Sequence, residues 1–167
     1  SLIEQIKNKE IDFFYFFNKK NKKIDNNFII KKKKFIDSIY NFKNFRLTCW
    51  NYIINRKFVV DNKIQFNNKI KVFEDQIFVL NLIKYSKNFQ IIKKSHYIKN
   101  PTSLSKITGK IVIRSSVFAL REIIKLSNQK ISLKFKKFLE KRIKYYIDQF
   151  FLNLNLVNKN EEKIYLK

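Results

Sequence analysis

Residues 35–80 read FIDSIYNFKNFRLTCWNYIINRKFVVDNKIQFNNKIKVFEDQIFVL, and this stretch carries the most informative local pattern in the chain. Its apolar positions predict two short amphipathic helices joined by a tight turn at 41–44, because each set recurs on one face of a 3.6-residue period. The two apolar faces are Phe35, Ile36, Ile39 and Tyr40, then Leu47, Trp50, Ile53 and Ile54. Trp50 is therefore expected in the core.

Strand-like runs follow the second predicted helix. Residues 58–60 and 63–66 are rich in β-branched and aromatic residues and flank Asp61-Asn62, a pair that tolerates positive φ, so they predict a β-hairpin. Residues 76–82 are nearly all apolar and predict a buried strand. The pattern as a whole predicts the α+β class.

The order of these residues resembles the alpha-L RNA-binding motif, as found in the family of small-subunit ribosomal protein four. Phe35-Ile36-Asp37 is similar to the opening of the motif, Val60-Asp61-Asn62-Lys63 to its hairpin, and Glu74-Asp75 with Ile77 to its last element. The chain departs from the family pattern where the opening Arg, a Ser-Arg pair and two glycines are usual; it has Phe35, Arg46 alone, Asn62 and Glu74 there.

The resemblance implies a small alpha-L RNA-binding module at 31–82, with two helices packed on a short twisted β-sheet. A helical N-terminal extension and linker would precede it at 1–30, a strand and loop connector would follow at 83–115, and basic helices would end the chain at 116–167. The resemblance further implies a structural, non-enzymatic protein of an organellar small ribosomal subunit. Such a protein would bind the 5′ domain of the small-subunit ribosomal RNA beside neighbouring ribosomal proteins, with no cofactor and no small-molecule substrate.

The charge of the chain agrees with a polyanionic partner. Lys and Arg number 37 against 13 acidic residues, a net charge of +24 that favours nucleic acid first and an anionic membrane surface second. With 45% hydrophobic residues, much of the chain is expected to fold. The dominance of residues with AT-rich codons enriches Lys by itself and suggests an organellar genome, mitochondrial first and plastid as the alternative.

The predicted RNA contacts are basic residues of the motif and of a C-terminal helix. Residues 31–34 form a basic run before the motif that suits either phosphate contact or a charged surface turn. The predicted set is Lys33, Lys34, Lys43, Arg46, Arg56, Lys57, Lys63, Lys134, Lys137, Lys141 and Lys144.

Two helices are predicted near the C-terminus. Ser116 is a reasonable N-cap for a helix through Leu126, and Ser132 for a longer one. The longer helix combines an apolar stripe with the lysines at 134, 137, 141 and 144, which suit phosphates, anionic headgroups or a plain solvated face. Its apolar stripe is Phe135, Leu139, Ile143, Tyr146 and Phe150. Residues 153–167 lack a clear period.

Other segments give weaker signals. Residues 89–92 and 110–113 predict strands, the second after a turn at Thr108-Gly109. The aromatic residues at 13–17 are expected either to continue an N-terminal helix or to be extended.

Several classes of site find no support in the sequence. No apolar run reaches the roughly 20 residues of a transmembrane helix, and His96 has no second His, Cys or carboxylate close by to share a metal. Cys49 is alone and is expected to be a small packed residue. Two other function classes stay open: an RNA-modifying enzyme that carries the motif as an appendage, and a lineage-specific protein of an organellar ribosome or membrane complex that acts through protein contacts.

Overall fold

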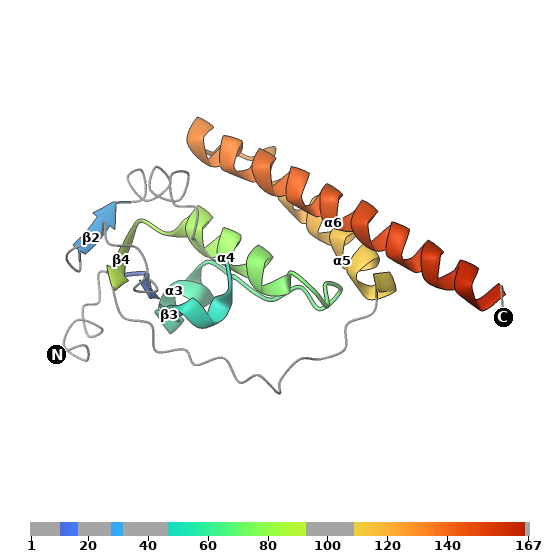
Figure 1. The fold of residues 1–167 in the computed structure, drawn as a ribbon. Coiled ribbons are helices and arrows are strands. Elements are labelled where there is room, and N and C mark those ends of the chain that lie inside the picture. The colour runs from blue at the N-terminus through green and yellow to red at the C-terminus, as the bar shows by residue number, and fades with distance from the viewer. Residues whose placement is uncertain (1–10, 17–27, 32–46, 93–108, 166–167) are drawn as a thin grey trace. The chain divides into compact units, whose positions relative to one another are not determined.

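The structure, a computed structural model, describes residues 11–16, 28–31, 47–92 and 109–165 (Figure 1). The strands are β1 (Phe13–Phe16), β2 (Phe28–Lys31), β3 (Tyr52–Ile54) and β4 (Asn88–Ile92). The helices are the 3₁₀ turn η1 (Cys49–Asn51), α3 (Arg56–Asp61), α4 (Glu74–Tyr85), α5 (Gly109–Ser127) and α6 (Leu133–Tyr165). The predicted α+β class with C-terminal helices is confirmed.

The chain divides into two compact units. One consists of residues 1–65 and 78–99, and the other of residues 66–77 and 100–167. This division differs from the boundaries expected from the sequence, because residues 66–77 of the expected 31–82 module group with the C-terminal helices. The cause is a set of side-chain contacts from residues 71–76 to α5 and α6, given below.

The first unit contains a four-stranded sheet with the order β2-β4-β1-β3. The strand β1 pairs parallel with β4 and antiparallel with β3, and β2 pairs antiparallel with β4. Phe13 and Phe89 are register partners, and their rings stack with centroids 5.1 Å apart at full burial. The strand predicted at 89–92 is confirmed, and the aromatic residues 13–16 are extended.

Asp12, the acidic residue next to the aromatic strand β1, is held in place by four hydrogen bonds. Its carboxylate accepts hydrogen bonds from the backbone N–H groups of Lys87 (2.6 Å) and Asn88 (3.0 Å). Its own backbone N–H donates to the carbonyl of Asn88 and its carbonyl accepts from Asn55, both at 3.0 Å. Asp12 therefore fixes the start of β4 and its alignment with β1.

The helix predicted at 47–54 is wrong, because η1 and the strand β3 occupy this segment. Asn51 donates its side-chain amide to the hydroxyl of Thr48 at 2.6 Å, which stabilises the turn instead of a longer helix. Tyr52 then pairs with Tyr15 across the sheet. Trp50, expected in the core, is 49% exposed, and Cys49 is partly exposed in the turn. The first predicted helix, at 35–40, lies outside the described residues.

The hairpin predicted around Asp61-Asn62 is also wrong, because residues 56–61 form the helix α3. Asn55 caps its N-terminus by accepting from the backbone N–H of Lys57 at 3.0 Å. At the other end Lys63 has φ 52, and the N–H groups of Lys63 and Ile64 donate to the carbonyls of Val60 and Val59, both at 3.0 Å. This pattern is a Schellman motif, and the burial of Ile64 (5% exposed) supplies its hydrophobic contact.

The strand predicted at 76–82 is the helix α4. A short apolar run suits a buried helix as well as a buried strand, because neither shows a polar face. Here Val79, Leu80, Leu82 and Ile83 are all fully buried. Glu74 and Asp75 lie in the first turn, where the partial positive charge of a helix N-terminus favours carboxylates.

The helices α5 and α6 form an antiparallel pair that is the main part of the second unit (Figure 1). The strand predicted at 110–113 is wrong, since α5 begins at Gly109, and Ser116 lies inside this helix instead of capping it. A Cβ atom on Gly109 would lie 2.9 Å from Cγ2 of Val157, so glycine allows the two helices to approach closely there.

The helix α6 begins as the sequence predicts. The hydroxyl of Ser132 accepts from the backbone N–H of Phe135 at 3.3 Å, which is the geometry of an N-cap. Phe135, Leu139 and Tyr146 of the predicted apolar stripe are at most 1% exposed, and the other two members, Ile143 and Phe150, are partly exposed. The helix continues to Tyr165, through a segment in which the sequence shows no period.

Candidate nucleic-acid interface

Four lysines of α6 share an exposed side of the helix. They lie at spacings of three and four residues, so they advance about 15 Å along the axis. They are the predicted Lys134, Lys137, Lys141 and Lys144, and all four are exposed. The buried Phe135, Leu139 and Tyr146 lie on the opposite side. The predicted basic stripe is thus present, and its contact with RNA stays a prediction.

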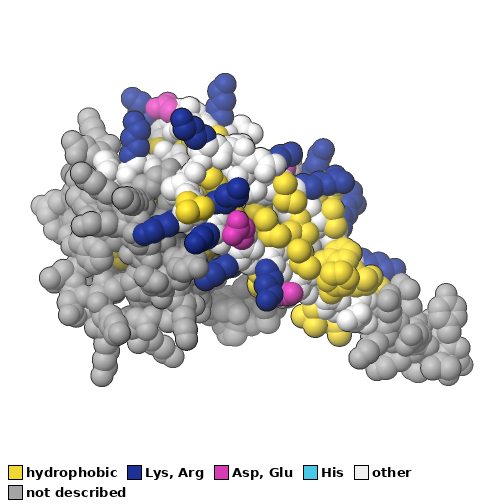
Figure 2. All heavy atoms as spheres, turned by 90° about the horizontal axis from the view of Figure 1, so that it is seen from above, with side chains coloured by type: hydrophobic (Ala, Val, Ile, Leu, Met, Phe, Trp, Pro, Cys, Tyr) yellow, Lys and Arg dark blue, Asp and Glu magenta, His cyan; other side chains and the backbone are white. Residues whose placement is uncertain are grey.

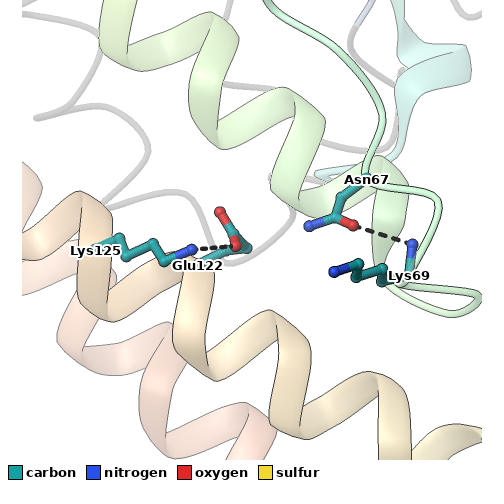
Figure 3. A network of polar contacts seen from close by, with 4 residues as sticks. All are labelled: Asn67, Lys69, Glu122 and Lys125. Atoms are coloured by element: carbon teal, nitrogen blue, oxygen red, sulfur yellow. Dashed lines mark hydrogen bonds and ion pairs between the residues drawn. The ribbon is translucent and has the colours of Figure 1, made fainter.

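A second basic face runs along α5, and none of its members belongs to the predicted contact set. Its members follow spacings of four, seven and four residues, which places them on one side of the helix. They are Lys110, Arg114, Arg121 and Lys125, all exposed. Lys125 forms an ion pair of 3.0 Å with Glu122 one turn away (Figure 3). Lys110 and Arg114 were missed because the predicted helix began only at Ser116.

An aromatic ring lies within the α5 face. The guanidinium carbons of Arg114 and Arg121 are 5.8 and 5.9 Å from the ring centroid of Phe118, within the range of a cation–π contact. Phe118 is only partly buried. A basic helix face with an aromatic ring between two arginines can contact both phosphates and bases.

The loop before α4 brings two more cations to this face. Asn67 accepts a hydrogen bond from the backbone N–H of Lys69 at 3.0 Å, which holds a turn in the loop (Figure 3). Ile70 is buried at 2% exposure. The hydroxyl of Ser115 accepts from the backbone N–H groups of Lys71 (3.3 Å) and Val72 (3.2 Å). The Ser115 hydroxyl therefore fixes the loop on α5, with Lys69 and Lys71 exposed.

A cavity of about 460 Å³ lies between this loop and α5. Three cationic residues line it: Lys69, Lys71 and Arg114. Its other described lining residues are Asn68, Ser115, Ile111 and Phe118, so none of the described lining residues is acidic. The cavity combines positive charge with an aromatic ring and an aliphatic side chain.

A polar network lies beside α6 and serves the fold. The side-chain oxygen of Gln76 accepts from the Arg142 guanidinium and from the Tyr146 hydroxyl, the latter at 2.7 Å. The Arg142 guanidinium also lies 4.7 Å from the ring centroid of Tyr145, and the Phe73 and Tyr146 ring centroids are 4.9 Å apart. Arg142 is thus held by neighbouring side chains and differs from the exposed lysines of α6.

Burial changes the acidity of two groups in and beside this network. It raises the pKa of Asp75 to about 6, opposed by the hydrogen bond from the backbone N–H of Gln76 (2.7 Å) and reinforced by the carboxylate of Glu74. It also raises the pKa of Tyr146 to about 12, against the effect of Arg142. Both shifts follow from packing, because the charged form of a buried group is poorly solvated.

Three of the seven predicted motif residues lie in the described part of the chain. Lys33, Lys34, Lys43 and Arg46 lie outside the described residues. Arg56 and Lys57 occupy the first turn of α3, and Lys63 follows its C-terminus; all three are exposed. Since α3 replaces the predicted hairpin, these three residues do not form the expected basic hairpin.

Metal and membrane sites find no support in the described parts of the chain. Within residues 11–16, 28–31, 47–92 and 109–165, no three His, Cys, Asp or Glu side chains gather in a way that could hold a metal ion. None of the described helices has the length and apolar character that crossing a bilayer requires.

Comparison with known proteins adds no relative. No protein-family model matches the chain, and no curated protein matches it either.

Proposed function

We propose that this protein is a non-enzymatic RNA-binding protein of an organellar ribosome, mitochondrial in the first instance and plastid in the alternative. The outer faces of α5 and α6, with Lys69 and Lys71, would bind the phosphate backbone of RNA. Phosphate contacts supply most of the affinity of such proteins and need no base-specific geometry.

The observation that carries the proposal is that exposed basic residues and buried apolar residues lie on different sides of α5 and α6. From Gly109 to Val157 the chain has eleven Lys and Arg residues but only three acidic ones, Glu122, Glu140 and Asp148. The buried side of α5 and α6 carries residues such as Ala119, Ile123 and Leu139, each 0% exposed. A like-charged surface of this density repels itself, and a polyanion neutralises it.

The small-subunit ribosomal RNA is the proposed target because of the residue order at 35–80. Residues 47–82 do not form the elements of the alpha-L motif, so the helical faces, and not the motif, support RNA binding. The identity of the RNA is accordingly a separate part of the proposal.

The test of RNA binding is the salt dependence of the dissociation constant of the purified full chain for a short RNA duplex. Each phosphate contact contributes a slope of roughly 0.7–0.9 in log Kd against log salt. The triple variant Lys137→Ala/Lys141→Ala/Lys144→Ala should lower the slope by about two. The control Lys87→Ala removes an exposed lysine in the other unit and should change it far less. An affinity that does not respond to salt would contradict the proposal.

A second candidate is a lineage-specific protein that acts through protein contacts. The observation in its favour is a set of exposed apolar residues from the middle of α6 onward: Ile147, Phe151, Leu152 and Leu156. In the view of Figure 2, hydrophobic side chains form a patch on the helical part that lysine and arginine side chains border. Association through this patch would persist at high salt, whereas RNA binding through phosphates would not.

A further inference from the structure

The cavity between residues 68–71 and α5 has two kinds of lining. Lys69, Lys71 and Arg114 supply positive charge from two segments more than 40 residues apart in sequence. Phe118 and Ile111 supply apolar surface from positions about two turns apart on one helix. The volume of about 460 Å³ falls within the range of small-ligand sites, roughly 300–1,000 Å³.

The cavity is held in place by contacts that do not use its cations. Ser115, 2% exposed, anchors the loop through the backbone N–H groups of Lys71 and Val72. Asn67 shapes the loop through the backbone N–H of Lys69. The charged ends of Lys69 and Lys71 are therefore not what ties the loop to α5, and the site is formed before a ligand arrives.

We infer that this cavity takes one unpaired nucleotide of the bound RNA. Its phosphate would lie among Lys69, Lys71 and Arg114, and its base would stack on the ring of Phe118 beside Ile111. Unstacked bases of single strands and bulges bind to aromatic side chains in this way, and stacking tolerates any base. The inference rests on the proposed RNA binding and specifies which part of the RNA this site selects.

The lining favours a nucleotide over simpler anions. A phosphate alone would use the three cations but gains nothing from Phe118 and Ile111. An anionic lipid would use both, but its acyl chains need an extended apolar surface, and here Asn68 and Ser115 leave only two apolar residues among the described lining. A nucleotide presents an anion, polar base edges and one flat apolar surface, which matches this combination.

The experiment compares two RNA duplexes that differ only in one bulged uridine. We expect the wild-type chain to bind the bulged duplex about tenfold more tightly, since stacking on one aromatic ring has an effect of that size. Phe118→Leu keeps the apolar volume but removes the ring, and should abolish the preference, so that the variant binds the two duplexes equally. The matched control Phe151→Leu changes an exposed aromatic residue on α6 and should leave both affinities unchanged.

A second readout locates the base. A bulge that carries 5-iodouridine should crosslink on irradiation to the peptide that contains Phe118, and Lys69→Gln should reduce the yield. Loss of the bulge preference only in Phe118→Leu supports the inference. Equal affinity of the wild-type chain for the two duplexes, equal weakening of both by Phe118→Leu, or crosslinks elsewhere would overturn it and leave RNA binding intact. Absence of any salt-sensitive RNA binding would overturn both proposals.

Discussion

The hydroxyl oxygen of Ser115, inside α5, lies 3.2 Å from the backbone nitrogen of Val72 and accepts its hydrogen bond. It accepts a second one from Lys71 at 3.3 Å. A single buried side chain thus satisfies two backbone donors of a loop that is 43 and 44 residues away in sequence. These two hydrogen bonds hold the loop on α5, so that Lys69 and Lys71 line the same cavity as Arg114.

Ser115→Ala should destabilise the second unit by about 1–3 kcal/mol, because it leaves two backbone N–H groups without their acceptor. RNA affinity should fall as well, since the loop lysines lose their fixed position. Chemical denaturation and RNA titration measure the two effects. Ser116→Ala is the matched control: this neighbour is also buried, but its hydroxyl donates only to the carbonyl of Val112 at 2.9 Å, within α5. Its replacement should change stability by less than about 0.5 kcal/mol, and equal effects of the two variants would contradict this account of the loop.

Gly109→Ala should destabilise the α5–α6 pair by about 1 kcal/mol. The added methyl group meets Cγ2 of Val157 at 2.9 Å, and valine is stiff at χ1, so the clash outweighs the better helix propensity of alanine. The second change Val157→Ala should restore stability in the double variant. A thermal-unfolding double-mutant cycle with a coupling near zero would show that the two residues do not meet.

Lys63→Gly should stabilise the first unit by about 0.5–1 kcal/mol, because glycine adopts φ 52 without strain. Asn62→Gly should destabilise it, since Asn62 donates its side-chain amide to the carbonyl of Phe58 at 2.8 Å. A hairpin with its turn at Asp61-Asn62 would give the opposite order for these two variants. Urea midpoints of both proteins, measured with the wild type, decide between α3 and the hairpin.

The stability of the chain should depend on pH through Asp75. Its pKa in the folded state is raised to about 6, so the folded state binds the proton more tightly than the unfolded state does. Stability is therefore highest below the ordinary carboxyl range, falls as pH rises from about 4 to 6, and is then constant for this group. Asp75→Asn should remove this decline and raise stability at pH 7 by on the order of 1 kcal/mol, allowing for partial solvent exposure. Urea unfolding at pH 4.5 and 7 measures it, and an unchanged decline in the variant would exclude Asp75 as its cause.

The sequence predicts α6 well, because Ser132 gives a local capping signal and Phe135, Leu139 and Tyr146 repeat on one face. It fails at 47–82, where each short apolar run suits a strand or a helix and only packing decides. Glu74-Asp75 is a usable signal for a helix start, but the nearly all-apolar run at 76–82 also suits a buried strand. The lysines of α6 could be named in advance because one helix places them together. Lys69, Lys71 and Arg114 could not, because a tertiary hydrogen bond to Ser115 brings them together.

Ultraviolet crosslinking of the native protein in intact source cells, with sequencing of the attached RNA and mapping of the crosslinked peptides, tests both RNA binding and the identity of the RNA. The account predicts small-subunit ribosomal RNA joined to peptides from residues 68–71, 110–125 and 134–144. Crosslinks from these peptides to a different RNA would support the proposed interface but reject small-subunit ribosomal RNA as the target. Crosslinks to protein alone would contradict the claim that these faces bind RNA.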